Sequence, residues 1–515
     1  MKNLYITAID IGTNSFHMII AKVDPTTYKF SIIDREKEFV RLGCNLFNSK
    51  YIDDAAIERS IETLQKFKKI FSGYKTIVRA IGTSAVREAK NSNKFIQKIK
   101  EKTGINVEVI SGIEEARLIY KGVVNYLPIY EKQTLIFDIG GGSTEFLIAK
   151  KNKVLFGDSL KLGTIRMTDK FFIDKNYNLK NIKRCQYFIK GIVYSVARKI
   201  KDIDFEIAVG TSGTVLTVFN IAKNLYSNSK VKENILTKDN FKEIYKMIIK
   251  KMTPEKISNI PGMDEKRADI ILPGIIILNE IFNQLNLREI MISNFALREG
   301  ILFDTIERQI NKKVLNQLKE LRYNSIINLA KKFNIEIKHS FHTVKCALKI
   351  FDELKKLHKL GHKEREYLHY AAILHEIGLA ISHSQHHIHS YYIIKNSELF
   401  GFTENEKEII ANICRYHRKS HPKEDHQNFL NLFNEDKIVV LKLSSILRIA
   451  DGLDRLHSSL IEIDKCLVTK DKVKIILHYP FKENIYIDKW GADIKKNLFE
   501  EVFNKKVIFE YKPKK

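Results

Sequence analysis

Two stretches of the chain repeat one pattern: residues 135–148 read LIFDIGGGSTEFLI, and residues 8–21 read AIDIGTNSFHMIIA. In each, an apolar segment ends near an aspartate, a glycine turn with hydroxyl side chains follows, and a second apolar segment begins. The pattern predicts a β-strand that turns back through a loop whose backbone N–H groups suit a phosphate. Because the carboxylates of Asp10 and Asp138 would repel phosphate directly, we expect them to hold a cation beside it. Two such loops facing each other across a cleft would grip a phosphate chain.

Two further glycine-hydroxyl loops follow predicted strands, AIGTSAVR at residues 80–87 and AVGTSGT at residues 208–214. The first of these loops opens a predicted helix, so its backbone N–H groups and Arg87 could hold phosphate oxygens. A single turn of this kind is usually an ordinary β-turn. Four of them within one α/β region indicate a phosphate-binding site.

Residues 111–117, SGIEEAR, predict the start of a helix with two adjacent glutamates. Ser111 is a suitable N-cap, and Glu114 then stands at the third helical position of a capping box. Glu115 is left without that role. If it points into the cleft, its carboxylate could accept a proton from an attacking water.

Composition fits a soluble globular protein of two to four domains, with 515 residues and 44% hydrophobic residues. The formal net charge of +26 favours a polyanionic partner, although the same lysine excess would follow from an AT-rich genome. Five scattered cysteines form no motif and fit a reducing cytoplasm. The first residues run directly into a predicted strand, and no apolar run reaches transmembrane length, so we expect neither a cleaved signal nor a membrane span.

The order of predicted elements indicates α/β architecture in the first 300 residues. Apolar spacing predicts a helix at 54–71, a strand at 76–81, a helix at 113–126, and strands from 134 and at 205–209. Residues from about 310 to 460 show almost only helical periodicity. The last fifty residues predict strands at 472–478, 485–487 and 506–511 around a helix at 489–503.

These motifs resemble the exopolyphosphatase/guanosine pentaphosphate phosphohydrolase (Ppx/GppA) family, within the actin-like ATPase and sugar-kinase superfamily. Further matching stretches are VISGIEEARLIY, RADIILPG and SNFALREG, followed in the C-terminal half by YAAILHEIG, HHIHSYYII and ILRIADGLDR. The predicted fold is therefore α/β, with two actin-like (ribonuclease H-like, ASKHA-type) domains at 1–125 and 126–308. An all-α HD-like domain at 309–462 and a small α/β C-terminal domain at 463–515 are expected to follow.

The resemblance implies a role for each motif residue. Glu115 matches the catalytic base, while Asp138 and Glu145, with Asp10 opposite them, match positions that organise Mg²⁺ or Mn²⁺. The implied phosphate-binding positions are Gly12, Thr13, Asn14, Ser15, Arg87, Gly140, Gly141, Gly142, Ser143, Thr144, Ser212 and Gly213.

The C-terminal half resembles an HD-type helical domain, whose metal ligands would be His339, His375, residue 376 and Asp451. Residue 376 is Glu where a working HD phosphohydrolase has Asp, and its longer side chain argues against a second hydrolytic centre. A second group contains His383, His386, His387 and His389, with His417, Arg415, Arg418 and Lys419. It is interpreted either as a polyanion path or interface, or as a hydrogen-bonded structural cluster.

The resulting hypothesis is a cytoplasmic, Mg²⁺-dependent exopolyphosphatase that releases orthophosphate from the end of inorganic polyphosphate. The alternative substrate is pppGpp, hydrolysed to ppGpp, and one enzyme could act on both. The acidic residues at 115, 138 and 145 argue against a non-catalytic sensor. Nucleic-acid binding would require exposed aromatic residues among basic ones, and no such stripe is evident. The resemblance also implies a homodimer.

Overall fold

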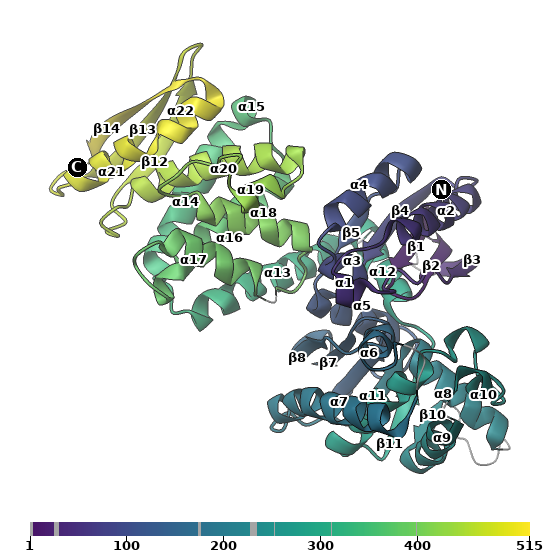
Figure 1. Cartoon of the computed structure of the whole chain (residues 1–515). Helices are drawn as coiled ribbons and strands as arrows, with labels where there is room; N and C mark the ends of the chain where they lie inside the picture. Colours follow the sequence, from purple (N-terminus) through teal and green to yellow (C-terminus); the bar gives the residue numbers. More distant parts are fainter. Residues whose placement is uncertain are drawn as a thin grey trace. The chain divides into compact units, whose positions relative to one another are not determined.

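A computed structural model describes residues 4–24, 30–173, 177–226, 234–251, 253–310, 312–397 and 399–514; of residues 310 and 312–321 it describes the backbone alone. The chain divides into two compact units, Met1–Asn316 and Gln317–Lys515 (Figure 1). Among the described helices, none combines the length and the apolar character that crossing a bilayer requires.

The first unit contains two sheets, and the first has the strand order β3-β2-β1-β4-β5. Its strands are β1 (Leu4–Ile11), β2 (Phe16–Val23), β3 (Phe30–Glu38), β4 (Thr76–Gly82) and β5 (Val107–Val109). Strands β1, β2 and β3 form an antiparallel meander, while β4 and β5 continue parallel to β1. The tight turn from β1 to β2 is the first predicted phosphate loop.

The second sheet has the order β10-β11-β9-β6-β7-β8. Its strands are β6 (Thr134–Ile139), β7 (Thr144–Lys150), β8 (Lys153–Leu160), β9 (Ile207–Thr211), β10 (Ile235–Thr237) and β11 (Glu289–Ile292). Again the first three strands form an antiparallel meander, and β9 and β11 follow in parallel. This shared plan agrees with the prediction of two actin-like α/β domains.

Helices pack against both sheets. Besides α5 (Gly112–Val124) and α12 (Leu297–Ile310), the described α-helices of this unit are α1 (Leu46–Ser49), α2 (Asp54–Phe71), α3 (Ser84–Glu88), α4 (Ser92–Thr103), α6 (Thr164–Phe171), α7 (Leu179–Lys199), α8 (Ser212–Leu225), α9 (Lys238–Lys251), α10 (Pro254–Ser258) and α11 (Ile271–Gln284). The predicted helix at 54–71 is confirmed by α2. The side chain of Asp53 caps its first turn, and Ile57, Leu64 and Phe67 are buried at helical spacing.

Helix α5 (Gly112–Val124) connects the two halves of this unit. It packs against α12 (Leu297–Ile310) and also against β6, β7 and β8, while α12 itself returns to β1 and β2. Asp304 of α12 is buried and accepts hydrogen bonds from Arg79 of β4 and Arg117 of α5. Since buried charged hydrogen bonds are costly to break, this network fixes α5 and therefore the direction of its first turn.

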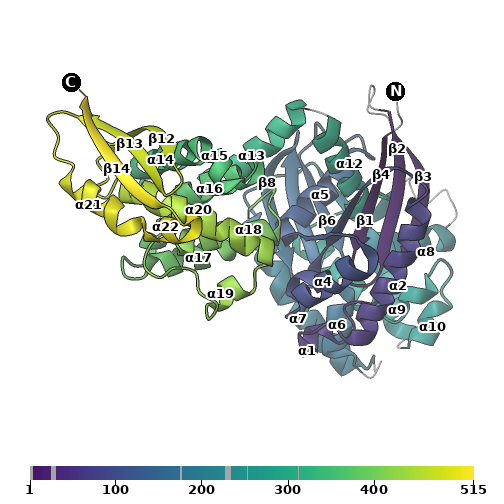
Figure 2. The same cartoon turned by 90° about the horizontal axis from the view of Figure 1, so that it is seen from above.

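The second unit is helical at first and ends in a small sheet (Figures 1 and 2). Its helices are α13 (Lys312–Lys332), α14 (Ile337–Glu353), α15 (Lys355–His358), α16 (His362–Leu374), α17 (His386–Lys395), α18 (Glu404–Arg415), α19 (Gln427–Leu430), α20 (Asn434–Gly452), α21 (Tyr486–Lys495) and α22 (Asn497–Phe503). Strands β12 (Glu462–Val468), β13 (Lys472–Pro480) and β14 (Lys506–Lys514) follow in this spatial order. Helices and strands share one hydrophobic core, which includes Ile350, Leu447 and Ile475.

Two strands of this end region were predicted and two expectations were wrong. Strands β13 and β14 confirm the predictions at 472–478 and 506–511. The predicted strand at 485–487 is instead the start of α21, and the expected helix at 489–503 is two helices, α21 and α22. In α21 the buried positions are Asp488, Gly491, Ala492 and Lys495. The buried face of this helix thus includes polar residues, and a search for apolar periodicity does not count them.

Candidate active site

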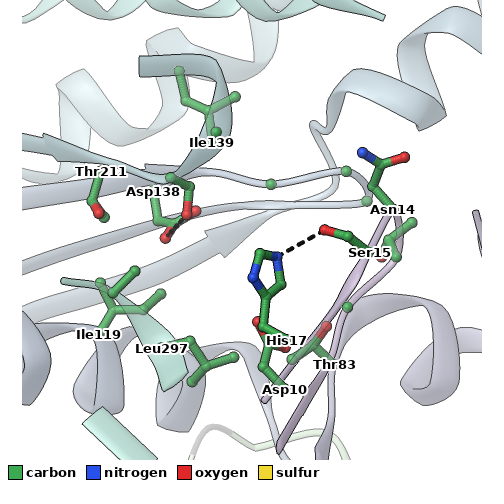
Figure 3. A pocket seen from close by; sticks show the side chains of 18 of the residues that line it. Asp10, Asn14, Ser15, His17, Thr83, Ile119, Asp138, Ile139, Thr211 and Leu297 are labelled. Atoms are coloured by element: carbon green, nitrogen blue, oxygen red, sulfur yellow. Dashed lines mark hydrogen bonds between the residues drawn. The ribbon is translucent and has the colours of Figure 1, made fainter. Parts of the chain in front are cut away.

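A cavity of about 220 Å³ lies where the two sheets of the first unit meet. The carboxyl ends of β1 and β6 supply Asp10 and Asp138, and α5 supplies Glu115. Figure 3 shows Asp138 on one side of this cavity and Asp10 with His17 on the other. The predicted site residues that line it are Asp10, Gly12, Thr13, Asn14, Ser15, Glu115, Asp138, Gly140, Gly141, Gly142, Ser143, Ser212 and Gly213.

The two predicted phosphate loops touch each other directly. A Cβ atom placed on Gly142 would lie 2.5 Å from Ser84 Oγ and 2.9 Å from Thr13 Oγ1. One placed on Gly141 would lie 3.1 Å from Thr13 Cβ. Glycine is therefore required at residue 142, because the backbone of this loop must approach the loops of the first sheet.

Four carboxyl groups gather at the base of the cavity: Asp10, Glu115, Asp138 and Glu145. Burial raises the pKa of each of them, and mutual repulsion raises those of Asp10, Asp138 and Glu145 further. The pKa of Asp138 is raised to about 7, although a hydrogen bond donated by the Ser212 hydroxyl lowers it. Such shifts mean that negative charge has been concentrated where the protein itself does not fully neutralise it.

Asp10 gives a more direct sign of a cation-binding site. Its Oδ1 atom is buried and has no hydrogen-bond partner among the described residues. Oxygen-only donors of this kind suit a hard divalent cation such as Mg²⁺ or Mn²⁺. The residues present therefore fit the predicted cofactor.

The neighbouring glutamates of α5 have different environments. Ser111 caps the helix by accepting from the backbone N–H of Glu114, as predicted. The Glu114 carboxylate is buried and accepts two hydrogen bonds from Arg117, at 2.6 and 2.7 Å. Glu115 instead faces the cavity, where its Oε2 accepts a hydrogen bond of 3.1 Å from Arg87.

Three predicted site residues lie behind the described lining of the cavity. Arg87 contacts Glu115 and the carbonyl oxygen of Ile110. Thr144 is fully buried and donates to the Leu162 carbonyl at 2.6 Å. Glu145 is paired with Asp138 across β6 and β7 and accepts from the Ser159 hydroxyl at 2.9 Å.

The Ser212–Gly213 loop enters from the second sheet. It follows β9, whose last residue lies beside Asp138, and it starts α8. Ser212 has a left-handed backbone, with φ of 70°, and its hydroxyl donates to Asp138. This strained conformation presents the N-terminus of a 14-residue helix to the cavity, where the helix dipole favours an anion.

Three cations that received no role from the sequence also line the cavity: Lys37, Arg267 and Arg298. Arg298 donates to His17 Nδ1 at 3.1 Å, so the neutral ring donates through Nε2 to the Ser15 hydroxyl at 2.8 Å (Figure 3). Burial and Arg298 hold the pKa of His17 well below its usual range, which keeps the ring neutral. The signal for both arginines was present in the stretches RADIILPG and SNFALREG.

Three histidines of the predicted basic cluster in the C-terminal half are buried. His386, His387 and His417 are at most 9% exposed, so the interpretation of these three as part of a surface path for a polyanion is wrong. His383 and Lys419 are exposed, and the basic track remains a prediction for exposed cations of this kind. The predicted metal ligands of the same unit, His339, His375, Glu376 and Asp451, do come together.

Comparison with known proteins decides the relationship. Residues 19–309 match the Ppx/GppA phosphatase family, and residues 321–490 match domain III of Ppx/GppA phosphatases. The chain belongs to the Ppx/GppA phosphatase family.

Solved structures of Ppx/GppA relatives match about three fifths of this chain. An exopolyphosphatase from Cytophaga hutchinsonii is 30% identical, with a TM-score of 0.54, over 59% of this chain and 98% of that one. The Aquifex aeolicus Ppx/GppA family member is 28% identical, with a TM-score of 0.51, over 60% of this chain and 99% of that one. Nearly complete coverage of both relatives places their entire folds within this chain.

Gly213 provides a test of the Arg267 guanidinium at this Ppx/GppA site. A Cβ atom at residue 213 would lie 1.9 Å from Arg267 Cζ, so Gly213→Ala must displace that flexible side chain from the cavity. Losing one charged hydrogen bond to a phosphate corresponds to about 1.5–3 kcal/mol, or a KM roughly 10- to 100-fold higher.

The matched control is Gly191→Ala in α7, where an added Cβ would meet nothing within 4 Å. Steady-state phosphate release should show a raised KM for Gly213→Ala and unchanged values for the control. An unchanged KM in both variants would mean that Arg267 does not contact the substrate.

Proposed function

We propose that this chain is an exopolyphosphatase that hydrolyses the terminal phosphoanhydride of inorganic polyphosphate and releases orthophosphate. One observation carries the proposal: two opposed phosphate loops, a buried glutamate and three cations line the same cavity. Membership of a phosphatase family and the exopolyphosphatase among the similar structures support it.

In the proposed reaction, Glu115 accepts a proton from the water that attacks the terminal phosphorus. Arg87 binds Glu115 Oε2, which holds the carboxylate in one direction. Burial raises the pKa of Glu115 while Arg87 lowers it, and a carboxylate of raised pKa is the stronger base at neutral pH. A base of this kind contributes roughly 10²- to 10⁴-fold to the rate.

Charge on the phosphoryl oxygens is stabilised from several sides. Backbone N–H groups of the loops at Gly12 and Gly140, together with Arg267 and Arg298, are placed to bind these oxygens. Asp10 and Asp138 would hold Mg²⁺ or Mn²⁺, with Glu145 behind them, and the cation would neutralise charge on the phosphate. Because the phosphoryl oxygens carry more charge in the transition state than in the bound substrate, these groups stabilise the transition state more strongly.

Polyphosphate is favoured over pppGpp by the chemistry of the cavity wall. The described lining residues present backbone, hydroxyl, amide, charged and aliphatic groups, with His17 as the one ring and no Phe, Tyr or Trp among them. A guanine base would therefore find no large aromatic face on which to stack. A cofactor of Mg²⁺ or Mn²⁺, a homodimer and a cytoplasmic location remain predictions made from the sequence.

The deciding experiment measures orthophosphate release from long-chain polyphosphate and from pppGpp at equal concentrations of terminal phosphate, with Mg²⁺. We expect kcat/KM to be at least about tenfold higher for polyphosphate, the equivalent of about 1.4 kcal/mol. Glu115→Gln, assayed in parallel, shows that the activity comes from this site. Greater efficiency with pppGpp would assign the chain to pppGpp hydrolysis, and no release from either substrate would contradict both.

A further inference from the structure

Four side chains of the second unit converge on one point inside the protein. They are His339 on α14, His375 and Glu376 at the end of α16, and Asp451 near the end of α20. One ligand atom from each lies within 4.8 Å of the others. Both imidazoles are fully buried, Asp451 is buried, and the Glu376 side chain is 12% exposed. Helices α14, α16 and α20 all pack against one another, so the fold itself brings these residues together.

Hydrogen bonds fix which ring nitrogens carry protons. His339 Nδ1 lies 2.9 Å from Asp454 Oδ2, and His375 Nδ1 lies 2.9 Å from the carbonyl oxygen of Ala372. A carboxylate and a carbonyl oxygen only accept, so each Nδ1 donates and each neutral ring leaves Nε2 as a lone pair. These two Nε2 atoms face each other at 3.2 Å. Two opposed lone pairs in a buried site are unfavourable unless a proton or a metal ion lies between them.

A neighbouring pair of histidines shows how the same contact is satisfied without a cation. His386 Nε2 and His417 Nε2 are also 3.2 Å apart. Arg418, which can only donate, binds His386 Nδ1, so neutral His386 carries its proton on Nε2 and donates it to His417. His417 Nδ1 then donates to the Cys414 carbonyl. This hydrogen-bond chain closes. At the His339–His375 contact, the Thr343 hydroxyl lies 3.5 Å from His339 Nε2, at the limit of a hydrogen bond, and does not supply a proton between the two rings.

The rival occupant of the His339–His375 contact is a proton. It would join the two rings but would not explain why one carboxylate oxygen of Glu376 and one of Asp451 also lie within 3.8 Å of these Nε2 atoms. Glu376 Oε2 lies 3.8 Å from His339 Nε2, and Asp451 Oδ1 lies 3.7 Å from both Nε2 atoms. These distances are too long for hydrogen bonds. Ligands about 2.1 Å from a tetrahedral metal are separated by roughly 3.4 Å, which is close to these four spacings of 3.2–3.8 Å.

The surroundings hold the four groups in that arrangement. Asp454 and the Ala372 carbonyl orient the two rings through their Nδ1 atoms, which is the usual support for metal-binding histidines. Lys495 binds Asp451 Oδ2 and leaves Oδ1 directed at the histidines. The ring of His457 stacks on His339, with centroids 3.7 Å apart, and closes that side.

We propose that His339, His375, Glu376 and Asp451 bind a first-row transition metal ion of the Zn²⁺ or Fe²⁺ class. Two imidazoles disfavour Mg²⁺ and Ca²⁺. Four protein ligands from three elements form a closed site, which assigns the ion a structural role in joining α14, α16 and α20. The proposal lies outside the catalytic cavity and goes beyond the proposed function, because phosphatase activity neither requires nor excludes it.

Full-length protein without a polyhistidine tag, purified without chelators, is analysed for metal content by mass spectrometry. We expect about one transition metal ion per chain. Co²⁺ added to chelator-treated protein should give visible absorption bands that saturate at about one equivalent. His375→Gln should remove both signals. His386→Gln, in the hydrogen-bonded pair, and Asp138→Asn, in the catalytic cavity, should retain them.

A second variant and a stability measurement distinguish the loss of a metal ligand from misfolding of the variant. Glu376→Gln keeps the size of the most accessible ligand and should weaken Co²⁺ binding at least about tenfold. Chelation should lower the melting temperature of the wild type, and Zn²⁺ should restore it. Metal-free protein that neither binds Co²⁺ nor gains stability with Zn²⁺ would overturn the proposal and assign the contact to a shared proton. Metal content unchanged in both ligand variants would overturn it equally.

Discussion

Replacing Glu115 by Gln is expected to lower turnover by at least about 100-fold while polyphosphate binding is retained. Glutamine keeps the size of the side chain and an oxygen that can still accept from Arg87, but it cannot take a proton. Turnover is measured by orthophosphate release under saturating substrate, and binding by calorimetry on the inactive variant.

Glu114→Gln is the matched control one residue earlier. The Glu114 carboxylate pairs with Arg117 away from the cavity, so this change should lower stability and leave turnover within a few-fold of wild type. Near-normal turnover of Glu115→Gln combined with an inactive but folded Glu114→Gln would reverse the assignment of the two glutamates.

Asp138→Asn is expected to have opposite effects on activity and on stability. The carboxylate is a proposed cation ligand, and its loss should cost several kcal/mol of transition-state stabilisation, at least about 100-fold in rate. In protein without divalent cations, the same change should stabilise the fold. Asn can still accept from Ser212, and it removes a buried charge that Glu115 repels.

The pH dependence of that stabilisation follows from the raised pKa of Asp138. Between its ordinary value near 3.8 and the folded value of about 7, the folded chain keeps a proton that the unfolded chain loses. Stability of the wild type therefore falls as pH rises through this window. Above pH 7 the penalty is complete, at up to about 4 kcal/mol. Below about pH 4 both states are protonated and the penalty vanishes.

Thermal unfolding of metal-free wild type and Asp138→Asn at pH 4, 6 and 8 measures this difference. The melting temperatures should diverge as pH rises, with the variant more stable at pH 8. Mg²⁺ should raise the melting temperature of the wild type much more than that of the variant. A variant less stable than wild type at pH 8 without metal would contradict the repulsion inferred for the four carboxyl groups.

Local patterns in the sequence were sufficient to predict most of the secondary structure of the first unit. Strand β6 and the helix α2 were predicted because apolar spacing and turn chemistry depend on residues a few positions apart. The same method failed at residues 485–487, where Ile485 and Ile487 suggested a strand. There the helix α21 buries Asp488 and Lys495 through partners elsewhere in the unit, so the apolar pattern was misleading.

The role of Arg87 shows a second limit of prediction from the sequence. Its position after a glycine loop suggested a phosphate ligand, and the structure places its guanidinium on Glu115, 28 residues later in the chain. No local pattern relates these two residues. Arg87 lies on α3 and Glu115 on α5, so their contact depends on how the first unit packs as a whole.

The sequence by itself determined the α/β class, the four glycine loops and the aspartates at the strand ends, because each of these features is encoded within a few consecutive residues. Only the tertiary structure decided that Gly142 meets Thr13, that Arg267 and Arg298 reach the same cavity, and that His339 faces His375. These contacts join residues that are far apart in the chain. They form because helices and sheets can pack together in only a few ways. Which of these arrangements is adopted depends on the whole core and not on any one segment.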